Sequence, residues 1–141
     1  MMVPVFVAVA LFLTVSGTTH RTFTGERTLS VGGVPLLVAI ADSEMERARG
    51  LSGLSGLAEG EGMLFVFESA GLHAFWMKDM LFSIDILWIA ADGTIVHIAP
   101  SVSPDTYPQS FIPPTPARYV LEVRAGFATE HGIEVGSKVD F

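Results

Sequence analysis

The sequence predicts a mainly β protein, a compact sandwich or barrel of the jelly-roll type. Two observations lead to this prediction. Short apolar runs rich in Val, Ile, Phe and Trp alternate with turns that contain Gly or Pro along most of the 141-residue chain. Helical signals are confined to a short helix near residues 43–50 and a helical turn near 126–131.

The composition excludes several kinds of site. The chain has no cysteine, so it has no disulfide, no thiolate nucleophile and no Cys-ligated metal. Its formal net charge is −7, and its 8 Lys and Arg residues are scattered. Nucleic-acid binding needs a clustered basic surface that releases counterions. We therefore expect no nucleic-acid partner.

The N-terminal segment predicts export. Residues 3–15 are almost wholly apolar, but a spanning helix needs ~20 such residues, so the run better fits the apolar region of a signal peptide. We expect 1–17 to be a signal peptide or a short N-terminal anchor, 18–26 a linker and 27–141 a single domain. The protein would then be periplasmic, extracellular or membrane-anchored, and only its N-terminal segment would touch a membrane.

The first half of the domain begins with a hairpin. Residues 28–40 form two strands joined by a two-glycine turn. In the helix that follows, Ser43 and Glu46 have the spacing of a capping box. Residues 51–57 are rich in glycine, which disfavours regular structure, so their leucines should pin a loop onto the core.

The chain is organised around residues 62–89, which hold both tryptophans. Two apolar runs, 63–67 and 84–89, predict strands that are buried on both faces in the middle of a sheet. Asp92 and Gly93 predict the turn of a second hairpin. The proline-rich residues 100–116 predict a long, irregular loop packed on the domain.

The C-terminal part predicts two more strands. In residues 118–123 a period-2 alternation places Arg118 and Glu122 on one face. Residues 133–141 form the last predicted strand.

Several motifs, in this order and spacing, resemble the domain of unknown function 192 family: GMLFVF, His73, FWMKDM, IDILWI, Thr106-Tyr107-Pro108 and RYVLEVRAGFA. The resemblance covers the chain from about Leu36 to the C-terminus. It implies a compact β-sandwich, often behind a signal peptide or membrane anchor in bacteria and archaea, and no established activity. Asp79 and Met80 stand where many members carry Asn and Thr.

Trp76 and Lys78 are the first candidates for a binding site. In an extended segment they share one face, opposite Phe75, Met77 and Asp79. Trp76 could then stack on an apolar ring while Lys78 holds an anionic group. The alternative is that Trp76 belongs to the core and Lys78 covers apolar surface or neutralises a buried acid.

Asp85 lies within a predicted buried strand, so its carboxylate must be paired, hydrogen-bonded or protonated. Lys78 and Arg118 are the expected partners. The alternative is a catalytic acid with a raised pKa.

Other polar residues allow a patch or a metal site. Arg118 and Glu122 could form one patch with Glu61, Asp79 and His73. Asp79 and Asp85 could in principle act as paired carboxylates in general acid–base chemistry. A metal site would need His73 and His97 together with an acid.

Three hypotheses follow. The first is a non-catalytic envelope domain that binds a small ligand, a glycan or a protein near Trp76, Lys78 and Tyr107, with no cofactor or metal. The second is a hydrolase that uses carboxylates or a metal, drawn from Asp79, Asp85, Glu122, His73 and His97. The third is a structural or assembly module in which the central stretch is entirely core.

Overall fold

The computed structural model describes residues 25–141. The expected signal peptide or anchor, and the linker except for its last two residues, lie outside the described residues. No helix within 25–141 is both long enough and apolar enough to span a membrane.

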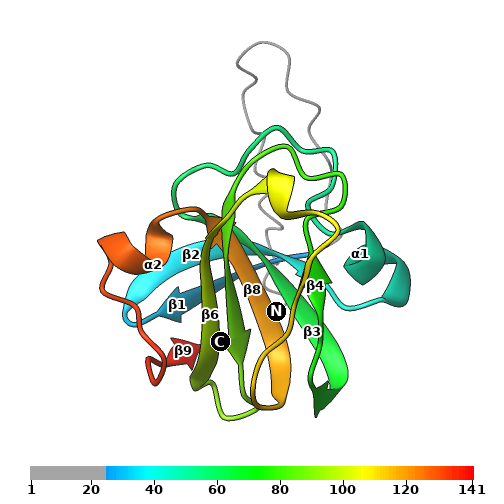
Figure 1. Ribbon diagram of the computed structural model, residues 1–141. Helices are drawn as coiled ribbons and strands as arrows, with labels where there is room; N and C mark the ends of the chain where they lie inside the picture. The colour runs from blue at the N-terminus through cyan, green and yellow to red at the C-terminus, as the bar shows by residue number, and fades with distance from the viewer. Residues whose placement is uncertain (1–24) are drawn as a thin grey trace, which may run out of the picture.

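The described chain is mainly β, as the sequence predicts (Figure 1). Its elements follow in the order β1 (Glu26–Val31), β2 (Val34–Ala41), α1 (Glu44–Arg49), β3 (Glu61–Gly71), β4 (Phe75–Trp76), β5 (Ile84–Ile89), β6 (Ile95–Val102), the 3-10 helix η1 (Pro104–Thr106), β7 (Ser110–Phe111), β8 (Ala117–Arg124), α2 (Phe127–Glu130) and β9 (Val139–Asp140).

Local sequence signals account for the first elements. The glycine turn joins β1 and β2 as an antiparallel hairpin. The capping box of α1 is present, because the Ser43 hydroxyl accepts from the Glu46 N–H while the Glu46 carboxylate accepts from the Ser43 N–H. In the loop after α1, Leu51 and Leu54 are buried. These three predictions are confirmed.

Seven strands form one curled sheet in the order β6-β5-β8-β3-β2-β1-β9. β2 and β3 pair in parallel, and parallel neighbours need a crossover connection. This crossover, defined here as residues 42–60, consists of α1 and the leucine loop. The ends of the sheet approach each other where Thr94 bridges Lys138 and the Ile95 N–H donates to the Ser137 carbonyl.

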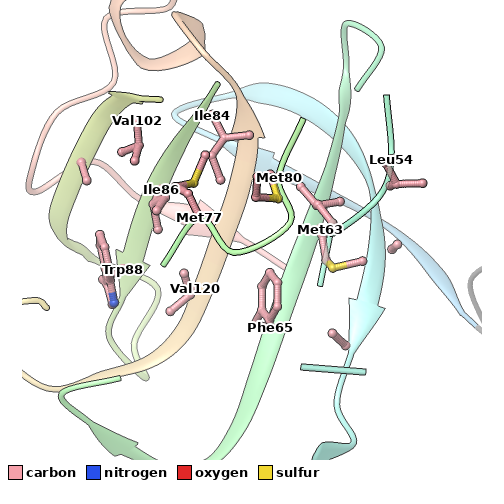
Figure 2. Packing of buried hydrophobic residues seen from close by; sticks show 14 of the residues in the cluster. Leu54, Met63, Phe65, Met77, Met80, Ile84, Ile86, Trp88, Val102 and Val120 are labelled. Atoms are coloured by element: carbon pink, nitrogen blue, oxygen red, sulfur yellow. The ribbon is translucent and has the colours of Figure 1, made fainter. Parts of the chain in front are cut away.

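Each face of the seven-stranded sheet carries a hydrophobic core, because successive side chains along a strand point to opposite faces. The Trp88 core includes Met63, Phe65, Met77, Met80, Ile86, Trp88 and Val120, and Figure 2 shows these side chains gathered over β3, β5 and β8. The Phe127 core includes Leu64, Leu87, Ile89, Leu121, Val123, Phe127 and Ile133.

The two cores are covered differently. The crossover and the two-stranded β4–β7 sheet supply residues to the Trp88 core, whereas α2 packs into the Phe127 core. Figure 1 shows α1 and α2 on opposite sides of the molecule. Phe75 of β4 meets Phe65 edge-on, with ring centroids 4.9 Å apart.

Two predictions about the C-terminal half are corrected. Residues 100–116 are not wholly irregular, because β6 extends to Val102 and the segment also contains η1 and β7. The last strand is only β9, because residues 133–138 turn across the sheet ends before the chain pairs with β1.

Candidate functional site

The site is built around a glutamate that enters an apolar face of the sheet. Alternation along β8 places Glu122 on the same face as Val120. The register then sets it between Met63 of β3 and Ile86 of β5. The residue is only 5% exposed. Its carboxyl group therefore lies in the Trp88 core.

This position decides the charge of Glu122. Burial raises the pKa of its carboxyl from 4.5 to about 8, because the charged form loses its hydration. Desolvation is the only cause of the shift, and among residues 25–141 no hydrogen bond or ion pair offsets it. Since no fully buried side-chain oxygen in this range lacks a partner, the Glu122 carboxyl is open to the cavity that it lines. At neutral pH the carboxyl is therefore mostly protonated, and it can both donate and accept a hydrogen bond.

Glu122 lines an open cavity of about 630 Å³, which we call the Glu122 cavity. The crossover, β3, β4 and the turn after β4 form its walls. Its apolar lining includes Leu51, Phe65, Phe67, Phe75 and Met80. Its other charged lining consists of Arg47, Arg49, Lys78 and Asp79. A volume in this range suits a small organic ligand.

Two arginines hold the part of β3 that forms one wall of the cavity: Arg47, which also lines the cavity, and Arg118, which does not. Arg47 donates to the Val66 carbonyl at 2.9 Å and lies 5.2 Å from the centre of the Phe67 ring. Arg118 donates through Nε to the Phe67 carbonyl. These carbonyls lie where the pairing of β3 with β8 shifts register, so the arginines satisfy acceptors that the ladder leaves open.

His73 belongs to this framework and not to the cavity lining. Its ring stacks on Phe67 at 3.6 Å with an interplanar angle of 8°. Its Nε2 donates to the Ser69 carbonyl at 3.1 Å, and its own carbonyl accepts from the Trp88 indole at 2.8 Å. These contacts fix the end of β3.

Trp76, Lys78 and Tyr107 gather at the outside of the β4–β7 sheet. The Lys78 ammonium lies 5.6 Å from the centre of the Trp76 ring, and the Tyr107 ring lies 5.4 Å from that ring. Trp76 is 49% exposed.

The predicted proximity of Trp76 and Lys78 is confirmed, and Phe75 and Met77 pack toward the core. The prediction that Asp79 shares the face of Phe75 and Met77 is wrong, because the strand ends at Trp76 and Asp79 lies exposed in the turn that follows. The alternative that Trp76 belongs to the core is wrong, because its face of β4 points away from the sheet.

The predicted partners of Asp85 are wrong. Asp85 faces the Phe127 core and is fully buried, and neither Lys78 nor Arg118 reaches it. Its carboxylate instead accepts three backbone N–H bonds, from Ser101 at 2.8 Å, Gly126 at 3.2 Å and Ala128 at 2.9 Å. Asp85 thus joins β5 to β6 and to the start of α2, and it does not line the Glu122 cavity.

The predicted polar patch is assembled only in part. Of its five members, Asp79 and Glu122 line the Glu122 cavity. The side chains of Arg118 and His73 donate hydrogen bonds to backbone carbonyls, and the Glu61 carboxylate accepts one from the Ala58 N–H. Lys78 and Trp76 also line the cavity, and Tyr107 adjoins it through Trp76.

The histidines and acids do not converge. His97 packs against the Trp88 ring at 5.3 Å. Within the described part of the chain, no three His, Asp or Glu side chains form a group that could hold a metal ion. The pair Asp79 and Asp85 is also separated, because only Asp79 lines the cavity.

Sequence reasoning does not identify two arginines and three phenylalanines of the cavity lining: Arg47, Arg49, Phe65, Phe67 and Phe75. In the sequence the two arginines lie in the last turn of a short helix, where positive charges stabilise the helix C-terminus. Only the crossover places this turn beside β4, so no local pattern marks these residues as lining a cavity.

Comparisons with known proteins agree with this fold. A protein from Sinorhizobium meliloti 1021, described as a proposed transcription regulator, is 28% identical with a TM-score of 0.80, over 86% of this chain and 97% of that one. A protein of unknown function from Novosphingobium aromaticivorans DSM 12444 is 25% identical with a TM-score of 0.79, over 89% of this chain and 94% of that one. A comparison with curated proteins finds no match.

The family model described as DUF192, Uncharacterized ACR, matches residues 27–141. This match spans nearly the whole described chain and agrees with the resemblance of the sequence motifs. The chain belongs to the DUF192 family.

Proposed function

We propose that this domain binds a small organic ligand in the Glu122 cavity. The observation that supports the proposal is the Glu122 carboxyl, which is buried, without a partner among residues 25–141, and on the cavity lining. Because this carboxyl opens onto the cavity, its free hydrogen-bonding capacity is available to a molecule that occupies the cavity. Most buried polar groups in proteins have partners, and a ligand would supply one here.

The rest of the lining supports binding of a ligand with an apolar body. Phe65, Phe67 and Phe75 offer aromatic surface beside a few polar groups. Ligand sites typically combine a mostly apolar wall with a small number of polar groups that fix orientation. Trp76 and Lys78 at the outer edge extend this surface toward Tyr107.

A hydrolase is the second candidate function. Glu122 and Asp79 line the same cavity, and a carboxyl that stays protonated near neutral pH suits a general acid. A hydrolytic role predicts turnover that Glu122→Gln abolishes, whereas a binding role predicts complex formation without turnover.

We also propose that the domain acts outside the cytoplasm and without nucleic acid. The apolar residues 3–15 support export, and the net charge of −7 with scattered basic residues does not favour a nucleic-acid surface. The description of the Sinorhizobium meliloti protein as a proposed regulator belongs to that protein.

The test is a thermal-shift screen of the full chain against a panel of small acids, amines, neutral aromatics and sugars. A ligand at a hundred times its Kd adds about 2.7 kcal/mol of stability, which raises the Tm by several degrees. We expect at least one class to raise the Tm of the wild-type protein.

A Glu122→Leu variant fills the position with an apolar side chain, and its Tm should no longer rise when the ligand is added. The control is Glu26→Gln, an exposed change on β1 outside the cavity, and it should keep the rise. Equal responses in Glu122→Leu and the wild type would contradict a ligand site at Glu122.

A further inference from the structure

We propose that the ligand of the Glu122 cavity is a small organic anion with an apolar, ring-sized body. This inference rests on the proposed function and adds the chemical class of the ligand.

The charges of the lining are mainly positive. Arg47, Arg49 and Lys78 contribute three cations, against Asp79 and Glu122, and Glu122 is mostly neutral at pH 7. The whole chain, by contrast, carries a net charge of −7. A local excess of cations on an acidic protein concentrates anions at that place and raises their rate of association.

A cationic ligand is disfavoured for a second reason. Aromatic walls can bind an ammonium group through the faces of their rings. Here the protein's own cations already lie near two of those rings, since Arg47 is 5.2 Å from the centre of Phe67 and Lys78 is 5.6 Å from the centre of Trp76. An added ammonium would compete for these rings and be repelled by both side chains.

The remaining walls suit the body of such a ligand. Leu51, Phe65, Phe75 and Met80 present apolar surface. Glu122 adds a hydrogen-bond donor that carries no negative charge while it is protonated. An anionic group beside Lys78 and Arg49, with a ring against the phenylalanines, would use both the cationic and the apolar parts of the lining.

The experiment uses three probes that share a ring and differ in charge: phenylacetate, phenylacetamide and phenethylamine. Affinities are measured on the full chain by amide NMR titration at pH 6.5 and low salt. We expect phenylacetate to bind at least about tenfold more tightly than the amide and phenethylamine to bind most weakly, in line with close charge pairs at a partly buried site.

The variant Arg49→Gln/Lys78→Gln should weaken phenylacetate binding about tenfold and leave phenylacetamide unchanged. The control is Arg27→Gln, which removes one cation from exposed β1 and should leave all three affinities unchanged.

Several outcomes would overturn the inference. It fails if phenylacetamide or phenethylamine binds as tightly as phenylacetate, if the double variant weakens all probes equally, or if no probe shifts the resonances of cavity residues. The proposed function survives any of these results when the wider panel still yields a ligand whose effect Glu122→Leu removes. The proposed function fails if that panel also yields no ligand, or only ligands whose effect Glu122→Leu leaves unchanged.

Discussion

Two buried carboxyl groups lie on neighbouring strands of this protein and have opposite surroundings. Asp85 of β5 and Glu122 of β8 are nearly adjacent in the register, because Ile86 pairs with Glu122 and Asp85 pairs with Val123. The pleat turns them to opposite faces. Asp85 meets three backbone N–H groups in the Phe127 core, whereas Glu122 meets only apolar neighbours and the open cavity.

The comparison shows that burial alone does not identify a functional carboxyl. Asp85 is the more deeply buried of the two, yet the fold uses both of its carboxylate oxygens to hold the start of α2 and the chain at Ser101. Glu122 is left with hydrogen-bonding capacity that the fold does not use. Its surroundings, and not its depth, make it the candidate for binding.

The largest expected effect tests the structural role of Asp85. Asp85→Ala removes three hydrogen bonds to a charged acceptor, each worth about 1.5–3 kcal/mol, so the free energy of unfolding should fall by about 5 kcal/mol or more. Urea unfolding at pH 6 measures the loss. Asp105→Ala, an exposed change in η1, is the control, and a loss below about 1 kcal/mol for Asp85→Ala would refute the structural role.

The next effect concerns the pH dependence that Glu122 gives to stability. Its pKa is raised from 4.5 to about 8 in the folded protein, so between these pH values the unfolded chain releases a proton that the native state keeps. The stabilising contribution is complete below pH 4.5, declines as the pH rises and is lost above about 8. The change is at most roughly 5 kcal/mol.

Glu122→Gln isolates this contribution, because Gln stays neutral over the whole range. The difference in unfolding free energy between wild type and variant, measured from pH 4.5 to 9, should move steadily in favour of the variant. Differences that stay constant with pH would show that Glu122 titrates alike in both states and would remove the contrast with Asp85.

The smallest effect concerns the edge of the cavity. Trp76 is half exposed, so Trp76→Ala should cost about 2 kcal/mol of stability. The matched change Trp88→Ala, in a fully buried position, should cost about 3–5 kcal/mol. Thermal unfolding compares the two variants, and equal losses would place Trp76 in the core, as the structural-module hypothesis requires.

Much of the fold follows from local patterns. The two-glycine turn, the Ser43–Glu46 capping box and the alternation along 118–123 each act over a few residues, and the structure confirms all three. The parallel pairing of β2 with β3 was not predicted, because it depends on how the crossover packs against the Trp88 core.

The site was predicted less completely, for a related reason. Glu122 was named from the alternation of its strand, but its neighbours Met63 and Ile86 are set by register across three strands. The partners of Asp85 are backbone N–H groups of Ser101, Gly126 and Ala128, which carry no side-chain signal. A prediction from side-chain charges therefore selected Lys78 or Arg118.

The most direct test of the account is the titration of Glu122 itself. Its side-chain carboxyl carbon can be followed by ¹³C NMR from pH 3 to 10, with Glu122→Gln identifying the resonance. We expect a midpoint near 8, because the carboxyl is desolvated in the Trp88 core. A midpoint near the ordinary glutamate value of 4.5 would mean that the carboxyl is solvated or paired, and would contradict Glu122 as the polar group of a ligand site.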